Sequence, residues 1–133
     1  MKDDCLFCKI ANKEIEAKIL YEDEYLMVIL DAYPDTDGHT LVIPKKHYED
    51  IYSIDPEMFL KIFTTGKEKA QTLMNKLDKS SLTFLINYGN AQAIKHFHLH
   101  LLPDFMHKEH KYSKEEIYDK LMKDWLWQEE KRS

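Results

Sequence analysis

Between residues 96 and 102 the chain alternates histidine with large apolar residues, and this alternation constrains its fold more than any other feature. Successive side chains of a β-strand point to opposite faces of the sheet. The segment from Ile94 to Pro103 is therefore predicted to be a strand whose two faces differ in chemistry. One face carries three imidazoles, and the other carries Phe97, Leu99 and Leu101.

Four further strands are predicted from extended apolar runs that are bounded by turn residues. The first two should form a β-hairpin around the turn Asp23-Glu24. Pro44 should end the third, because proline cannot donate a hydrogen bond to a strand ladder. A loop over 88–93 should lead from the fourth into the histidine strand. The predicted ranges are 19–22, 25–31, 39–44 and 82–87.

Three helical segments are predicted. A short one over 6–15 should follow a loop that contains two cysteines. A long one should begin at a cap on Ser53 or Asp55 and extend to Leu77, although Gly66 costs about 1 kcal/mol inside a helix. The third should span 113–127, with Ser113 and Glu116 as a capping box. Five strands that arrive mostly as neighbours, with one long helix and a C-terminal helix, predict an α+β domain on an antiparallel sheet.

Length and composition limit the class of protein. A chain of 133 residues is typical of one domain, and 44% apolar with 32% charged residues is ordinary for a globular protein. No apolar run approaches the roughly 20 residues that span a bilayer, and the first residues lack a signal layout, so we expect a cytoplasmic protein without membrane association. A net charge of -5 argues against nucleic acid as a partner but leaves a small anionic ligand open.

The histidine strand indicates phosphoryl chemistry. Alternate residues on a strand lie about 6 to 7 Å apart, so three imidazoles in a row can contact one phosphoryl group. A neutral imidazole can attack phosphorus, and an imidazolium can stabilise the charge that develops on its oxygens. Two other interpretations stay open at this point, a solvent-exposed sheet face and a metal cluster. The strand carries no carboxylate, which a hydrolytic zinc site would usually supply nearby.

The two cysteines, Cys5 and Cys8, are separated by two residues. A structural disulfide between them is not expected in a reducing cytosol, which leaves metal ligation or redox chemistry. The thioredoxin-like βαβ pattern that would support a redox pair does not surround them.

Several motifs together resemble the histidine-triad (HIT) family, in its zinc-containing bacterial branch. They are the triad His96-Phe97-His98-Leu99-His100, the run Cys5-Leu6-Phe7-Cys8-Lys9-Ile10, Tyr21-Glu22-Asp23-Glu24, Asp31, the run from Gly38 to His47, and Gln92. The resemblance covers roughly residues 5 to 103 and implies a HIT-like fold. We accordingly expect a single HIT domain over 1–133, with this motif-bearing core and a helical tail over about 113–128.

The resemblance also implies residue roles. His98 would attack the α-phosphorus of a nucleotide, and His100 and His39 would act with it as catalytic residues. The expected nucleotide-binding residues are Asp31 at the ribose hydroxyls, Gln92 at the phosphate and leaving group, and Asn87, together with His98 and His100. Relatives with a structural zinc hold it through residues that match Cys5, Cys8, His47 and His96. Family members are commonly homodimers that act on purine nucleotides.

The sequence departs from the family pattern beside the triad. The loop over 87–93 is about two residues shorter than usual, and Ala91 and Ala93 replace a glycine and a hydroxyl residue that flank the glutamine in relatives. Asp104 stands where relatives often have arginine, although His107, His110 and Lys111 are near it in the sequence. Three functions therefore compete: a nucleotide hydrolase, a slow-turnover nucleotide sensor or partner-binding protein, and a zinc-dependent interaction module that uses the tail Trp125-Leu126-Trp127.

Overall fold

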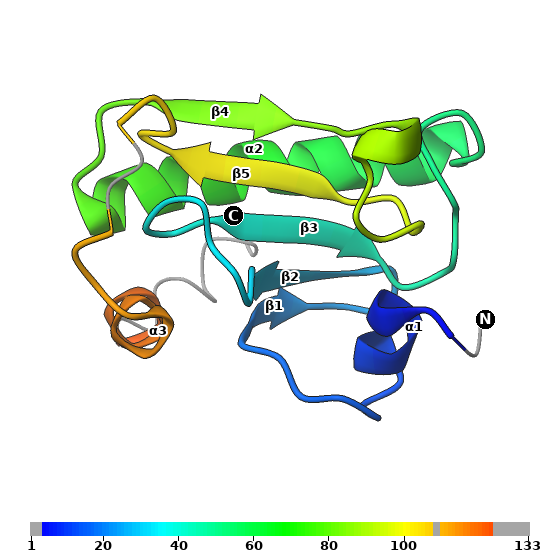
Figure 1. Ribbon diagram of the computed structural model, residues 1–133, viewed down its shortest axis with the longest axis horizontal. Coiled ribbons are helices and arrows are strands. Elements are labelled where there is room, and N and C mark those ends of the chain that lie inside the picture. The colour runs from blue at the N-terminus through cyan, green and yellow to red at the C-terminus, as the bar shows by residue number, and fades with distance from the viewer. Residues whose placement is uncertain (1–3, 108–109, 124–133) are drawn as a thin grey trace.

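The computed structural model describes residues 4–107 and 110–123, and their central element is a five-stranded antiparallel sheet (Figure 1). The strands follow the order β1-β2-β3-β5-β4, so β1 and β4 are its edges. The elements are α1 (Leu6–Ala11), β1 (Ile19–Glu22), β2 (Leu26–Leu30), β3 (Thr40–Pro44), α2 (Pro56–Leu77), β4 (Leu82–Leu85), the short 3-10 helix η1 (Gly89–Ala91), β5 (Leu99–Pro103) and α3 (Lys114–Met122). The predicted α+β class with one long helix and a C-terminal helix is confirmed.

The two faces of the sheet carry separate apolar layers. On one face α2 and α3 pack on β-strand residues that include Val42, Leu99 and Leu101, and Figure 1 shows α2 running behind the strands. On the other face α1 packs on Met27, Ile29, Leu41 and Ile43. Phe97, Leu99 and Leu101 all belong to the α2 layer, as the alternation predicts. The histidines between them consequently face the α1 side.

Gly66 lies where α2 comes closest to the sheet. A Cβ atom built on Gly66 would lie 2.7 Å from Cδ2 of Leu99, closer than carbon atoms approach without a shift. The glycine that weakens the helix in isolation therefore permits its tight packing on β5. Of the two predicted caps, Asp55 is the one that begins α2. Its carboxylate accepts hydrogen bonds from the backbone N-H groups of Glu57 and Met58.

The histidine strand is shorter than predicted. Regular pairing begins at Leu99 instead of Ile94, and residues 94–98 are irregular. The backbone N-H of Phe97 donates to the Tyr48 carbonyl at 2.7 Å, in the connection that follows β3. Because β3 ends at Pro44, the chain ahead of Leu99 bonds to this connection rather than to a strand ladder.

The short first helix also differs from the prediction. Cys5 is its N-cap, Cys8 lies inside it rather than in a preceding loop, and it ends at Ala11, four residues before Ile15. Strand β4 ends at Leu85, two residues early.

The predicted capping box begins α3, since Ser113 and Glu116 bond to each other's backbone. Helix α3 ends at Met122, and the predicted continuation to Trp127 lies outside the described residues. No helix among residues 4–107 and 110–123 is long and apolar enough to cross a membrane.

Candidate functional site

Three histidines come together where β3 and β5 pair on the α1 side of the sheet. His39 precedes β3, His98 precedes β5, and His100 lies within β5. The Nε2 atom of His39 is 2.9 Å from Nδ1 of His100. The ring centroids of His98 and His100 are 4.8 Å apart. The structure thus assembles all three residues that the sequence assigns to catalysis.

The hydrogen bond of His98 determines which of its nitrogens is free. Nδ1 of His98 lies 2.7 Å from the backbone carbonyl of His96. A carbonyl oxygen only accepts, so Nδ1 carries the proton and the Nε2 lone pair is available. Phe7 packs edge-on against the same ring at a centroid distance of 5.0 Å and restricts its rotation. His98 therefore presents an oriented lone pair on Nε2.

His39 and His100 form a proton chain with a fixed direction. The backbone N-H of Asp35 donates to Nδ1 of His39 at 3.1 Å, which leaves the proton of this imidazole on Nε2. That N-H donates in turn to Nδ1 of His100. His100 must then carry its own proton on Nε2, which makes that atom a hydrogen-bond donor.

Burial keeps these imidazoles neutral. It lowers the pKa of His98, and it lowers the pKa of His39 despite the opposing charges of Asp31 and Asp35. The pKa of His100 falls to about 3, because burial combines with the neighbouring His98 and His39. A lone pair on His98 is thus present at neutral pH beside uncharged N-H donors.

The other predicted nucleotide-binding residues differ in where they lie. A carboxylate oxygen of Asp31 is 3.5 Å from Nε2 of His39, and the Asn87 amide is 3.5 Å from Nε2 of His100. Gln92 is different, because its amide donates to the backbone carbonyls of Glu49 at 2.9 Å and Ile94 at 3.4 Å. The structure brings Asp31 and Asn87 to the histidines but holds the Gln92 amide in the loop.

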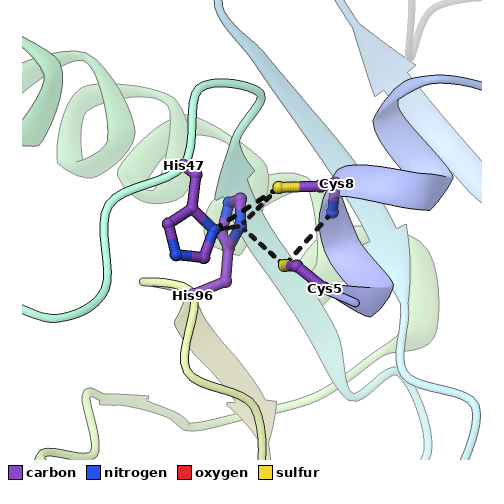
Figure 2. Close-up of side chains that lie close together, drawn as sticks. All are labelled: Cys5, Cys8, His47 and His96. Atoms are coloured by element: carbon purple, nitrogen blue, oxygen red, sulfur yellow. Dashed lines mark hydrogen bonds between the residues drawn. The ribbon is translucent and has the colours of Figure 1, made fainter. Parts of the chain in front are cut away.

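A second cluster, nearer to α1, includes His96. Figure 2 shows two cysteines from α1 facing His47, from the connection after β3, and His96, from the segment before β5. Nδ1 of His96 is 3.2 Å from Sγ of Cys5, 3.6 Å from Sγ of Cys8 and 3.1 Å from Nδ1 of His47. Nδ1 of His47 is 3.4 Å from Sγ of Cys8. These four atoms could hold one metal ion.

The spacing and the protonation of the cluster fit a tetrahedral zinc ion. With bonds of about 2.3 Å to sulfur and 2.0 to 2.1 Å to nitrogen, tetrahedral ligands lie about 3.3 to 3.8 Å apart, near the distances found here. Nε2 of His96 lies 2.8 Å from the Pro44 carbonyl, so its proton is on Nε2 and the Nδ1 lone pair points into the cluster. Burial raises the pKa of the Cys5 thiol, so a bound cation would be what ionises it.

Asp31, His39 and His100 are also close enough for one metal ion, but their hydrogen bonds do not suit it. A ligating imidazole needs a free lone pair at the metal. His39 accepts the Asp35 N-H at Nδ1, so its Nε2 carries a proton and cannot ligate. The possible ligand atoms lie similarly close together in both clusters. The clusters differ in the hydrogen-bond partner of the other nitrogen of the histidine ring, a carbonyl oxygen at His96 and a backbone N-H at His39.

Sequence reasoning missed the groups that orient these side chains. Phe7, between the two cysteines, contacts the rings of both His96 and His98. The carbonyls of Pro44 and His96 and the N-H of Asp35 select the protonated nitrogens. Backbone groups leave no side-chain signal in a sequence, and only the position of Phe7 within the Cys-x-x-Cys run could have indicated its role.

Comparisons with known proteins identify the family of this chain. Residues 12–107 match the HIT domain family. An uncharacterized HIT-like protein of Methanocaldococcus jannaschii is 41% identical over 103 residues, which cover 76% of this chain and 79% of that protein. An adenylylsulfatase of Arabidopsis thaliana is 33% identical over 105 residues, which cover 77% of this chain and 53% of that protein.

A solved structure resembles nearly the whole chain. The crystal structure of a zinc-bound histidine triad family protein from Mycobacterium smegmatis superimposes with a TM-score of 0.85 at 33% identity. The match covers 98% of each chain.

Proposed function

The chain belongs to the HIT domain family, and on that premise we propose that it hydrolyses nucleoside 5′-phosphate derivatives through a covalent nucleotidyl-histidine on His98. One observation carries the proposal. The free Nε2 lone pair of His98 stands beside the Nε2-H donor of His100, with both rings neutral. A nucleophile next to a donor for a phosphoryl oxygen is what displacement at phosphorus requires.

In the first step, Nε2 of His98 attacks the α-phosphorus. The new P-N bond forms as the bond to the leaving group breaks, and the leaving group departs with that electron pair. The Nε2-H of His100 donates to a phosphoryl oxygen and stabilises its charge. The carbonyl of His96 accepts from Nδ1 of His98 throughout and stabilises the positive charge that the attacking ring acquires.

In the second step, water attacks the same phosphorus and the P-N bond breaks. This releases the nucleoside monophosphate and restores the lone pair of His98, and the proton lost by water goes to the leaving group or to solvent. Asp31, on the same side of the site as His39, holds the ribose hydroxyls. The leaving group is either a second nucleotide that is joined through its phosphate or an amine. A sulfate is a third candidate, which the name of the Arabidopsis relative suggests.

Cys5, Cys8, His47 and His96 would hold a structural zinc ion. The cluster offers four protein ligands and no open position, which suits a zinc that stabilises the fold without taking part in the reaction. The zinc-bound relative from Mycobacterium smegmatis supports this assignment. Binding would tie α1 to the segment that carries His98.

We further propose that the protein is a homodimer that joins two sheets at β4. This strand is an edge of the sheet, and Phe84 on it is 43% exposed. Its ring stacks with Phe63 of α2 at a centroid distance of 6.2 Å, so an aromatic surface continues from the open edge onto the helix.

Turnover of diadenosine polyphosphate, adenosine phosphoramidate and adenylyl sulfate tests the function. We expect the wild type to act on at least one of them and His98→Ala on none. Mass spectrometry of the quenched wild-type reaction should show a nucleotidyl adduct on His98. Turnover that survives in a correctly folded His98→Ala protein would rule the mechanism out.

The loop around Gln92 favours a second function, that of a slow-turnover nucleotide sensor. The Gln92 amide is bonded to backbone carbonyls, and Ala91 and Ala93 beside it offer no hydroxyl to a leaving group. A sensor would hold a nucleoside monophosphate, and after displacing the leaving group of a nucleotide derivative it would accumulate the His98 adduct without completing rapid cycles. Single-turnover kinetics separate this behaviour from that of a hydrolase.

A further inference from the structure

Phe7 lies between the two histidine clusters and contacts one ring of each. Its ring meets the His96 ring edge-on, at a centroid distance of 5.7 Å and an interplanar angle of 88°. It meets the His98 ring at a centroid distance of 5.0 Å and an angle of 72°. The Phe7 side chain is 3% exposed, so both contacts are made inside the apolar layer on the α1 side of the sheet. One buried ring therefore connects a proposed metal ligand with the proposed nucleophile.

The orientation of the His98 ring determines whether it can attack. A half-turn of the imidazole about its Cβ-Cγ bond would exchange the positions of Nε2 and Cε1. It would also remove Nδ1 from the His96 carbonyl, to which it now donates at 2.7 Å. A carbon atom would then lie where the attacking lone pair is needed. Because edge-to-face rings attract each other and exclude other arrangements, the contact with Phe7 opposes this rotation.

The metal cluster determines where Phe7 lies. Helix α1 has six residues, too few for an isolated helix to be stable, so its position depends on contacts with the rest of the protein. Phe7 stands between Cys5 and Cys8 in the chain, and the thiols of both cysteines face Nδ1 of His96 (Figure 2). An ion held by these two sulfur atoms would fix the backbone on both sides of Phe7.

We propose that Phe7 is a positioning residue through which the occupied metal cluster keeps His98 in its attacking orientation. The inference rests on the proposed function. It gives the structural zinc ion an indirect effect on the reaction, because the ion fixes α1, α1 places Phe7, and Phe7 restrains the His98 ring. Phe7 acts on the reaction only by way of that ring.

Phe7→Leu tests the ring contact, because leucine keeps an apolar side chain at this position but has no ring. The first readout is the Nδ1-H signal of His98 in the NMR spectrum of zinc-loaded, nucleotide-free protein, assigned by its absence from His98→Ala. In the variant this proton should exchange with solvent about two- to tenfold faster, the range that corresponds to one edge-to-face contact. At saturating substrate, formation of the His98 adduct should slow about tenfold or more, since misplacing a reacting group is costly.

Cys8→His tests the link to the metal. It keeps four zinc ligands but moves the one that follows Phe7, so zinc should stay bound while the His98 proton exchanges faster. Cys5→His provides a second variant of the same kind. If the ligand change and Phe7→Leu act through one contact, combining them should slow adduct formation no further than the more affected single variant. Met27→Ala is the control, because it removes a fully buried side chain from the same apolar layer without removing a ring, and it should keep both wild-type rates.

The outcomes separate this proposal from the proposed function. Unchanged exchange of the His98 proton in Phe7→Leu would overturn the positioning role. A higher KM with an unchanged His98 signal would also overturn it, because Phe7 would then act by contacting the nucleotide. Additive losses in the double variant would disconnect Phe7 from the metal cluster. A folded wild type that forms no adduct and turns over no nucleotide, while the exchange rates behave as expected, would overturn the proposed function alone.

Discussion

The two histidine clusters contain the same ring in opposite arrangements. At His96 the backbone carbonyl of Pro44 holds the proton on Nε2, so that Nδ1 faces two thiols as an acceptor. At His39 the backbone N-H of Asp35 occupies Nδ1, so that Nε2 faces His100 as a donor. One backbone group on the far side of each ring therefore makes the first cluster able to bind a cation and the second able to bind an anion.

The clusters also differ in the residues that accompany the imidazoles. Two sulfur atoms, which are soft ligands that suit zinc, accompany His96, whereas the carboxylate of Asp31 and the amide of Asn87 accompany the other rings. The comparison teaches that a cluster of histidines does not define a metal site until the tautomer of each ring is known. Four measurements test this contrast between the clusters.

The largest effect should follow loss of a metal ligand. Cys8→Ser removes one of four proposed zinc ligands, so we expect the protein to lose its zinc and more than about 4 kcal/mol of its free energy of unfolding. Metal analysis of purified protein and urea denaturation measure both. His39→Asn, in the other cluster, should retain the zinc. Equal zinc loss in both variants would abolish the distinction between the clusters.

The next effect concerns catalysis without metal loss. His100→Ala removes the proposed phosphoryl-oxygen donor, so kcat/KM should fall about 10²- to 10³-fold, as it does when one preorganised donor is removed. Zinc content should not change. Steady-state kinetics with metal analysis on the same sample checks both points, and a variant that is fully active would remove His100 from the mechanism.

The pH dependence of stability should be a smaller effect. The pKa of His100 is about 3 when folded and about 6.5 when unfolded, so the unfolded chain binds more protons between these values. Stability from keeping His100 neutral is complete above pH 6.5 and is lost as the pH falls toward 3. His100→Gln should therefore lose less stability than the wild type on acidification. Parallel urea midpoints of both proteins from pH 7 to 4 would contradict this.

Asn87 should have the smallest effect. Its Nδ2 atom lies 3.5 Å from Nε2 of His100, and because both atoms are N-H donors in this arrangement they do not bond to each other. Asn87→Ala should reduce kcat/KM by about fivefold at most, since its Nδ2 does not bond to His100 and even a neutral hydrogen bond contributes only about 1 kcal/mol. A loss as large as that of His100→Ala would mean that Asn87 contacts the substrate directly.

The sequence was sufficient for much of the fold because period-two alternation and capping residues are local signals. The faces of residues 96–101, the capping box at Ser113 and the long α2 helix were all predicted from residues near them in the chain. The start of β5 could not be predicted in this way. Just before the strand, the backbone N-H of Phe97 bonds to Tyr48, which lies about fifty residues earlier in the chain. Gly66 similarly acquires its meaning only from Leu99, which packs against it from another element.

The candidate site divides in the same way. The identities of His39, His98 and His100 could be predicted from sequence patterns and a family resemblance, and the structure brings them together. Which nitrogen of each ring carries the proton could not be predicted, because it depends on hydrogen bonds to backbone carbonyls and N-H groups. Gln92 shows the same limit, since its side chain bonds to Glu49, which no local pattern connects with it.

His96 contributes to both clusters at once, through Nδ1 to the cysteines and through its carbonyl to His98. The two centres therefore share one residue, and only Phe97 separates it from the proposed nucleophile. An insertion or deletion of a single residue here would turn one of the histidines to the opposite face of the sheet. Protein engineers who wish to transplant either centre into another scaffold would have to move both, as one unbroken segment.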